Sequence, residues 1–352
     1  MNRSLEDIET PALIIDAAQV RTNIGAFQAH CTKAGLRLRP HIKTHKSGLF
    51  ARQQLAAGAI GITCQKISEA EVMAAAGVDD ILITFNIVGA PKVARLRALA
   101  KTVPTLAVVA DNLAVVKGLS DGFAPAPRPL SVLVECDTGA GRCGVQTPQA
   151  AAALAKAIAA APGLHFGGLM TYPPTGGQHA TARFLTEAKA ALTAGGLACP
   201  VVSSGGSPDM WSAQTHDIIT EYRIGTYIFN DRSLVEQGTC GWEDCAAYVL
   251  ATVVSTPSDR RVIIDAGSKA LSSDLLGLSG HGHVLGHPSA QISALSEEHG
   301  TVDFPGLAPL KVGARIRIIP NHICVVTNLF NSAWLQEKTC TPVAIDARGL
   351  LT

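Results

Sequence analysis

The chain has 352 residues, and its 29 Lys and Arg nearly balance 28 Asp and Glu, giving a formal net charge of +1. Only 16% of the residues are charged, below the roughly 25% of an ordinary soluble domain, and no apolar run reaches the roughly 18 residues of a membrane helix, so neither a nucleic-acid nor a membrane partner is expected. Nine cysteines without CxxC spacing, and an N-terminus without the apolar middle of a secretory signal, predict a cytoplasmic enzyme.

The first predicted strand is TPALIID at 10–16, followed by a helical pattern over 20–30. From about residue 36 to 228, apolar strand-like runs alternate with Ala-rich stretches such as 147–163, and a capping box is expected at Ser68 with Glu71. This alternation predicts βαβ units and a parallel sheet. The eight predicted strands cover 36–43, 59–64, 79–85, 106–111, 130–137, 165–172, 200–206 and 221–225.

Eight strands spaced about 20 to 35 residues apart are typical of a (β/α)₈ barrel, which we place at residues 17–244. A doubly wound open sheet is the alternative. From residue 245 the sequence is strand-like and punctuated by turns, which predicts an all-β domain made of residues 1–16 and 245–352. We expect one of its strands to continue through PNHIC, so that His322 and Cys324 project from the same face.

The unusual residues gather where the predicted barrel strands end. Because the active sites of such barrels lie at the C-terminal ends of the strands, the sequence predicts one polar rim there. The residues at these ends are His41, Lys43, Arg142, Tyr172, Ser203, Ser204, Gly205, Gly206, Ser207 and Tyr227.

Lys43 is the first candidate for chemistry at this rim. A lysine amine at a strand end can act as an imine-forming nucleophile or a base, although a basic turn can also be simply solvated. The Gly/Ser run 203–207 could turn backbone N–H groups toward a phosphate, or be an ordinary turn. Arg142, in a loop rich in glycine, could bind an anionic or phenolic oxygen, or lie on the surface.

His322 and Cys324 are the candidate metal ligands. Imidazole and thiolate suit Zn²⁺, but two such residues alone are also compatible with a buried core histidine. His179, after the loop PPTGGQ, has no decisive pattern around it. The further histidines that could contact substrate or metal are His281, His283, His287 and His299.

Five ordered motifs, RPHIKTHK, DTGAGRCG, VVSSGGSP, EYRIGTYIFND and PNHIC, resemble the fold-type III pyridoxal-phosphate enzymes related to D-threonine aldolase and D-serine dehydratase, with the alanine racemases as more distant relatives. The resemblance runs from about Thr10 to Asn328. It implies a cofactor-binding (β/α)₈ barrel, a β domain that includes the N-terminal strand, and a head-to-tail homodimer acting on a small D-amino acid.

The resemblance also implies roles for individual residues. Lys43 matches the lysine that carries pyridoxal 5'-phosphate as an imine, and Arg142 matches the arginine near the phenolic oxygen of the cofactor. His322 and Cys324 match a divalent-metal pair, for Zn²⁺ or Mn²⁺ with Mg²⁺ as a further candidate. The remaining cofactor-binding positions are His41, Tyr172, Ser204, Gly205, Gly206, Ser207 and Tyr227.

Two reactions on a D-3-hydroxy amino acid compete in this interpretation. Tyr172 followed by Gln178 and His179 resembles the aldolases, in which a histidine deprotonates the substrate hydroxyl. The His-x-Cys pair resembles the dehydratases. Because the base decides which bond breaks, we expect retro-aldol cleavage to glycine and an aldehyde, with dehydration of D-serine or D-3-hydroxyaspartate as the alternative. A racemase and a non-catalytic pyridoxal-phosphate carrier are more remote readings.

Overall fold

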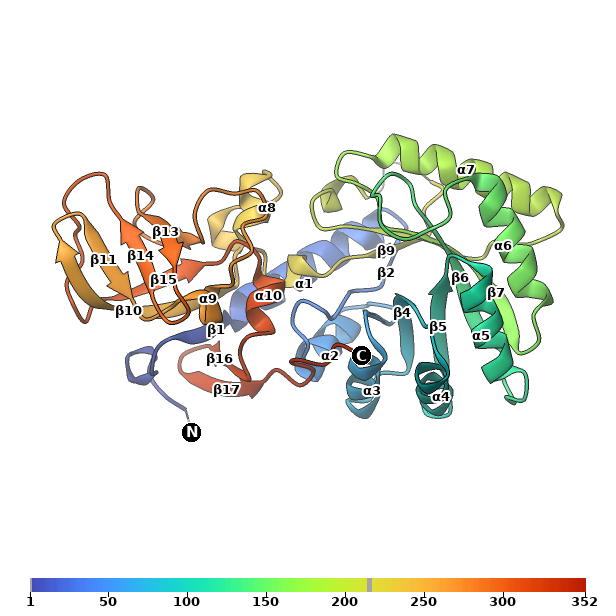
Figure 1. Cartoon of the computed structure of the whole chain (residues 1–352), viewed down its shortest axis with the longest axis horizontal. Helices are drawn as coiled ribbons and strands as arrows, with labels where there is room; N and C mark the ends of the chain where they lie inside the picture. Colours follow the sequence, from blue (N-terminus) through green and yellow to red (C-terminus); the bar gives the residue numbers. More distant parts are fainter. Residues whose placement is uncertain (1, 214–216) are drawn as a thin grey trace. The chain divides into compact units, whose positions relative to one another are not determined.

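The computed structural model describes residues 2–213 and 217–352, and its largest parallel element is an eight-stranded sheet (Figure 1). The strand order is β2-β9-β8-β7-β6-β5-β4-β3. The strands are β2 (Arg37–Leu38), β3 (Ile62–Cys64), β4 (Asp80–Asn86), β5 (Thr105–Ala110), β6 (Leu130–Cys136), β7 (Leu164–Thr171), β8 (Val202–Gly205) and β9 (Glu221–Arg223).

The two edges of this sheet are joined, so it closes into a barrel. The backbone N–H of Ile42 donates to the carbonyl of Thr63 at 2.9 Å, and the N–H of Thr63 donates to Pro40 at 2.7 Å. These bonds link the segment after β2 to β3, and β2 pairs with β9 on its other side. The predicted (β/α)₈ barrel is therefore confirmed, and the open sheet is excluded.

Helices alternate with the barrel strands, and their starts follow local sequence signals. At α5, the side chain of Asn112 accepts from the N–H of Val115 at 3.0 Å, and Thr147 caps α6 in the same way. These bonds satisfy N–H groups that have no partner inside a helix. The helices are α1 (Ala17–Lys33), α2 (Gly48–Ala56), α3 (Ile67–Ala75), α4 (Ala90–Leu99), α5 (Leu113–Phe123), α6 (Pro148–Ala160) and α7 (Gln178–Ala194).

The capping box predicted at Ser68 is wrong. Helix α3 begins at Ile67, and the carboxylate of Glu69 accepts from the N–H groups of Gln65 and Lys66 at 2.8 and 3.1 Å. Glu71 lies two residues further along the helix and forms an ion pair with Arg95 instead. Glu69 was overlooked because Ser68 offered the more familiar capping pattern.

Apolar side chains fill both faces of the barrel wall. Val132, Val134 and Cys136 belong to the large core between the strands and the surrounding helices. The alternate residues face inward, since Leu133 packs with Leu82, Val109 and Met170 in a separate cluster inside the barrel. Polar residues occupy other positions in the barrel interior, described below.

The remaining strands form a second, mostly antiparallel sheet in which β1 (Ala12–Asp16) is central. Strand β1 pairs with β10 on one side and in parallel with β16 on the other. The predicted all-β domain that takes in the N-terminal strand is therefore confirmed. Its other strands are β10 (Ala247–Ser258), β11 (Arg261–Ile264), β12 (His283–Val284), β13 (Gln291–Leu295), β14 (Gly300–Asp303), β15 (Arg315–Ile319), β16 (Ser332–Gln336) and β17 (Cys340–Ala344).

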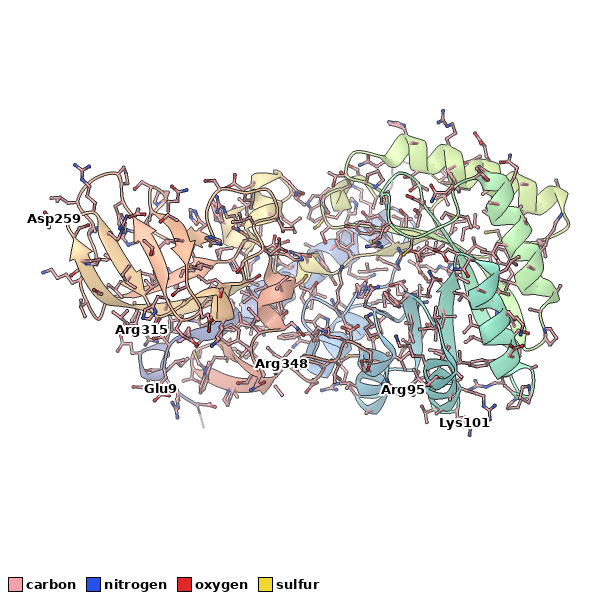
Figure 2. All side chains as sticks on the ribbon, in the orientation of Figure 1. Glu9, Arg95, Lys101, Asp259, Arg315 and Arg348 are labelled. Atoms are coloured by element: carbon pink, nitrogen blue, oxygen red, sulfur yellow. The ribbon has the colours of Figure 1, made fainter. Side chains whose placement is uncertain are left out.

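Short helices and turns complete this part of the chain. The guanidinium of Arg315 donates to the carbonyls of Leu5, Glu6 and Ile8 at 2.6 to 2.9 Å and so fixes the N-terminal segment (Figure 2). The short elements are α8 (Arg232–Glu236), α9 (Ser268–Leu271), α10 (Ile323–Thr327) and the 3₁₀ turns η1 (Leu5–Asp7), η2 (Met210–Ser212), η3 (Thr226–Ile228) and η4 (Trp242–Asp244).

The strand predicted through PNHIC is wrong. Strand β15 ends at Ile319, and helix α10 begins at Ile323. Pro320 has no N–H for a strand ladder, and the carboxylate of Asp231 accepts from the N–H of Ile323 at 3.1 Å, which stabilises the start of the helix.

The chain divides into two compact units. The barrel unit contains Ala26–Lys43, Gly48–Gly225 and Leu350–Thr352, and the β unit contains Met1–Gly25, Thr44–Ser47 and Thr226–Gly349. The domain boundaries drawn from the sequence at residues 16 and 244 stay a prediction. No helix of the described residues is long and apolar enough to cross a membrane.

Candidate active site

The segment after β2 holds Lys43 in a fixed backbone conformation. Its N–H donates to Nδ1 of His41 at 3.2 Å, and Nε2 of His41 donates to the side-chain oxygen of Gln65 at 3.1 Å. His41 is buried, whereas Lys43 is exposed. The histidine therefore fixes the backbone of the predicted nucleophile while the lysine side chain remains accessible.

The last residue of β8 and the residue after it both require glycine. A Cβ atom at Gly205 would lie 2.1 Å from the carbonyl oxygen of Arg223, and Gly206 has a φ of +127°. The hydroxyl of Tyr222 donates to the carbonyl of Gly206 at 2.8 Å. Ser204 and Ser207 lie on either side of the two glycines and are both buried, so their hydroxyls belong to the same short segment as the glycine backbone.

Arg142 and Tyr172 come together at the rim. The guanidinium carbon of Arg142 lies 5.0 Å from the centre of the Tyr172 ring. The loop that carries Arg142 is shaped by the carboxylate of Asp137, which accepts from the N–H groups of Gly139 and Gly141 at 2.9 and 3.2 Å. Two predicted cofactor-binding residues are therefore in contact.

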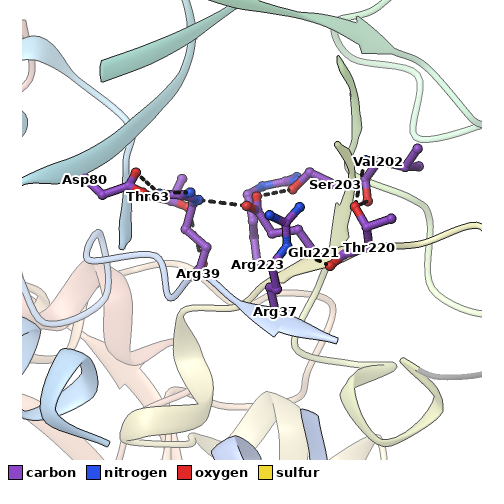
Figure 3. Close-up of polar contacts among 9 residues, drawn as sticks. All are labelled: Arg37, Arg39, Thr63, Asp80, Val202, Ser203, Thr220, Glu221 and Arg223. Atoms are coloured by element: carbon purple, nitrogen blue, oxygen red, sulfur yellow. Dashed lines mark hydrogen bonds and ion pairs between the residues drawn. The ribbon is translucent and has the colours of Figure 1, made fainter. Parts of the chain in front are cut away.

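Sequence reasoning missed a network of buried charges inside the barrel (Figure 3). Arg39 pairs with Asp80, and its Nε donates to Glu221 at 2.9 Å. Ser203 Oγ also donates to Glu221, at 2.6 Å, and accepts from Arg223 at 2.6 Å. Arg223 reaches the end of β7, where it donates to the carbonyl of Thr171 at 2.7 Å.

Burial and neighbouring charges shift the pKa values of Arg39 and Arg223 in opposite directions. Burial lowers the pKa of Arg39, but Glu221 and Asp80 more than offset it, so its pKa is raised. Burial dominates at Arg223 and lowers its pKa to about 10. Glu135, an inward residue on β6, also has its pKa raised by burial, against the opposing charges of Arg142 and Arg223.

In the β unit, His322 and Cys324 lie together although they are not on a strand. A side-chain hydrogen bond joins them. Nδ1 of His322 donates to the fully buried carboxylate of Asp231 at 2.9 Å. The Sγ atom of Cys324 is hydrogen-bonded to Thr44 at 3.1 Å and to Thr226 at 3.6 Å. Asp231 was missed by sequence reasoning.

Cys324 and Asp231 both act on the pKa of His322. Burial lowers the pKa of this imidazole, but the charge of Cys324 and the hydrogen bond that His322 donates to Asp231 outweigh burial and raise the pKa to about 10. Asp231 in turn accepts from Ser233 Oγ at 2.6 Å and from the N–H of Leu234, at the start of α8.

Comparison with known protein families identifies the family of this chain. The model for the N-terminal domain of alanine racemase matches residues 15–233, and the model for a putative serine dehydratase domain matches residues 246–335. The chain belongs to the alanine racemase family of fold-type III pyridoxal-phosphate enzymes. The resemblance drawn from its motifs is confirmed.

Three relatives of this family illustrate the similarity. D-threonine aldolase from Arthrobacter sp. is 35% identical over 92% of this chain and 88% of its own. The structure of D-threonine aldolase from Filomicrobium marinum has a TM-score of 0.93 at 30% identity, covering 100% of this chain and 99% of the other. D-threo-3-hydroxyaspartate dehydratase from Delftia sp. has a TM-score of 0.87 at 31% identity, covering 97% and 99%.

Two solved variants of a D-threo-3-hydroxyaspartate dehydratase bear on the metal pair. One replaces a histidine by alanine, and the other, described as metal-free, replaces a cysteine two positions further on. His322 and Cys324 have the same spacing. The cysteine variant of the relative was solved in a metal-free form, and the name of the relative describes a lyase that removes water.

The residues of the barrel unit fit the cofactor of the family. Pyridoxal phosphate needs an amine for its aldehyde and donors for its phosphate. Lys43 offers the amine, and the glycine loop with the hydroxyls of Ser204 and Ser207 offers the donors. Tyr227, predicted to join them, is buried in η3 and belongs to the β unit.

The pair in the β unit fits a divalent metal as a partial ligand set. The Asp231 bond to Nδ1 leaves Nε2 of His322 for a metal, the arrangement that orients zinc-bound histidines. No group of three or more His, Cys, Asp or Glu residues with metal-binding geometry occurs among the described residues. His322 and Cys324 would therefore supply at most two ligands to a metal, and its other coordination positions would fall to other groups.

His179 and the four further histidines lie outside these clusters. His179 is an exposed residue in the first turn of α7, after a loop held by a 2.8 Å hydrogen bond from the N–H of Gly176 to Asp209. His283 stacks on Trp242 with ring centres 3.7 Å apart. Burial lowers the pKa of His281 and of His283.

Proposed function

We propose that the chain is a metal-assisted, pyridoxal-phosphate-dependent lyase that cleaves D-3-hydroxy amino acids by a retro-aldol reaction, as D-threonine aldolase does. The observation that carries the metal-assisted part of the proposal is the hydrogen bond from His322 to the buried Asp231, beside Cys324; the preference for cleavage rests on His179. A racemase or a cofactor carrier has no use for an oriented metal-ligand pair.

Each group that the reaction needs has candidate residues. Lys43 would hold the cofactor aldehyde, Arg142 its phenolic oxygen, and His41 the backbone of Lys43. The phosphate would bind at Ser204, Gly205, Gly206, Ser207 and Tyr227, and Tyr172 would be a further cofactor-binding residue. The cofactor supplies an electron sink for charge that develops at the substrate Cα.

The metal pair would act on the substrate hydroxyl. A divalent metal held by His322 and Cys324 supplies a Lewis acid that polarises the 3-hydroxyl group. Thiolate and imidazole favour Zn²⁺ over Mn²⁺ and Mg²⁺. Asp231 keeps the imidazole in the tautomer whose Nε2 is free for the metal.

The product depends on which residue acts as the base and on which substrate proton it removes. In cleavage, His179 takes the hydroxyl proton, the Cα–Cβ bond breaks, and a proton returned to Cα completes glycine alongside an aldehyde. In dehydration, the amine of Lys43 takes the Cα proton and the hydroxyl leaves, giving a 2-oxo acid and ammonia after hydrolysis. The His-x-Cys spacing shared with the dehydratase variants favours this second function.

The assembly and location of the enzyme are part of the proposal. We infer a head-to-tail homodimer in the cytoplasm, because the motifs of the chain resemble a family in which both subunits contribute to each site. The mass of the particle in solution tests the first inference, and fractionation of the producing cell tests the second.

Product analysis tests the proposed reaction. The purified protein is incubated with pyridoxal phosphate, Zn²⁺ or Mn²⁺, and D-threonine, D-serine or D-3-hydroxyaspartate, with each L-enantiomer as a control. Glycine and an aldehyde are expected. A 2-oxo acid with ammonia would establish the dehydratase instead, and an L-amino acid from its D-enantiomer would establish a racemase.

A further inference from the structure

Two of the nine cysteines lie at the ends of one tight turn in the β unit. The N–H of Gly241 donates to the Asp244 carboxylate at 2.8 Å, and the N–H of Cys245 donates to the carbonyl of Trp242 at 3.2 Å. This turn, η4, separates Cys240 from Cys245 by only four residues. The chain therefore folds back on itself between the two thiols.

The side chains of the pair meet across the turn. A side-chain hydrogen bond joins Cys240 and Cys245, and Sγ of Cys245 also lies 3.8 Å from the carbonyl oxygen of Gly241. Both cysteines are half-buried rather than enclosed, and both are free thiols. A small soluble oxidant can therefore reach a pair of sulfur atoms that are already in contact.

The turn is held from both sides. The carbonyl of Asp244 accepts from the side-chain amides of Asn23 and Asn230 at 2.9 and 3.1 Å. Before the turn, the N–H of Thr239 donates to the carbonyl of Leu234 at the end of α8. Because these bonds already order the chain, closing a bond between the sulfur atoms requires little further loss of conformational freedom.

We propose that Cys240 and Cys245 are an oxidisable thiol pair that closes into an intramolecular disulfide in the presence of a peroxide. One thiolate attacks the peroxide O–O bond, forming a sulfenic acid and releasing one water equivalent. The second sulfur attacks the first, forms the S–S bond and releases a second water. Two thiols are oxidised and one peroxide is reduced.

The surroundings of the pair set the order of these steps. The hydrogen bond to Cys240, burial and the nearby carboxylates of Asp231 and Asp244 raise the pKa of Cys245. Because the thiolate is the reactive form, a raised pKa suits Cys245 to the role of the resolving thiol that closes the bond, and we assign the attack on the peroxide to Cys240.

Peptide mass analysis of the full chain tests the proposal. After brief treatment with hydrogen peroxide, remaining thiols are alkylated and the protein is digested with trypsin. The fragment from Ser233 to Arg260 contains both cysteines and no internal Lys or Arg. We expect it to lose two hydrogens and both alkylation sites, and to regain them after treatment with dithiothreitol.

Two comparisons make the test decisive. In Cys245→Ser, Cys240 should accumulate as a sulfenic acid that a dimedone probe captures, whereas the unchanged chain should give little capture there. The exposed Cys143 serves as an internal reference for a thiol outside the pair. If Cys143 is oxidised while the Ser233–Arg260 fragment keeps both alkylated thiols, or if the fragment gains oxygen without losing two hydrogens, the proposal is overturned.

Discussion

The barrel unit and the β unit position their candidate residues by different means. In the barrel unit, the residues gather because parallel strands end at one rim, and Arg142, Tyr172 and the glycine loop all follow such ends. In the β unit, the metal pair depends on one buried carboxylate, Asp231, and on a short helix. Topology thus places the first group, whereas individual hydrogen bonds place the second.

The largest effect is expected from Lys43→Ala in the barrel unit. Removal of the amine eliminates the covalent attachment of the cofactor, so activity should fall to background. The protein should also lose the visible absorption of bound cofactor after dialysis. Lys101→Ala, on the exposed surface near α4, is the control. Absorption retained by the Lys43 variant would refute the assignment.

His179→Ala tests the base at the same rim. Loss of a general base lowers kcat by about 10²- to 10⁴-fold, so retro-aldol turnover should fall by that factor while cofactor absorption is unchanged. His165→Ala, an exposed histidine on β7, should have full activity. Full aldolase activity in the His179 variant would remove the reason for preferring cleavage over dehydration.

Glu221→Gln tests whether the charge network in the barrel is structural. Removing one member of a buried ion pair costs about 3 to 5 kcal/mol, and because Arg39 keeps Asp80, we expect the lower end, about 3 kcal/mol, in urea unfolding. Asp80→Asn changes the more exposed partner of the same arginine and should cost less. Equal losses would show that burial is not the deciding factor.

Asp231→Asn tests the metal pair of the β unit without changing any residue at the barrel rim. Loss of the carboxylate behind a metal-binding histidine weakens metal affinity by about 10- to 100-fold, which competition with a coloured chelator measures. Asp303→Asn, in an exposed ion pair of the same unit, should leave metal affinity unchanged. An unchanged affinity in the Asp231 variant would mean that His322 is not a ligand.

Asp137→Asn should give the smallest effect. Burial raises the pKa of Asp137, but hydrogen bonds from Gly139, Gln146 and Gly141 outweigh it and lower the pKa. A depressed pKa stabilises the fold above the ordinary carboxyl pKa and loses that effect as pH falls through the lowered value. The variant should therefore lose about 1 kcal/mol at neutral pH and less in acid, measured by urea unfolding. A loss that grows in acid would contradict this sign.

The candidate site of the barrel unit can be predicted from the sequence better than that of the β unit, because it depends more on local patterns. Period-two alternation and strand spacing are local properties, so all eight barrel strands and the glycine loop could be predicted. The bond from Asp231 to His322 joins residues far apart in the chain, and no local pattern indicates it. The same holds for Glu221 with Arg39, although the alternation of Glu221 and Arg223 on β9 was a usable signal.

Local sequence patterns also gave wrong predictions where several of them competed. The apolar residues around PNHIC are typical of a strand, yet a distant carboxylate and Pro320 start a helix there. The cysteines looked scattered because spacing alone does not show that a turn brings Cys240 to Cys245. The roles of the rim residues and the domain boundaries stay predictions, which the variants above test.

The central place of β1 has a consequence for biosynthesis. Strand β1 is synthesised before the barrel strands, but its partners β10 and β16 are synthesised after them. Nearly all of the barrel unit leaves the ribosome between them and can fold while synthesis continues. The apolar residues of β1 must meanwhile stay without a strand partner, so the nascent chain carries an unpaired strand until β10 has been synthesised.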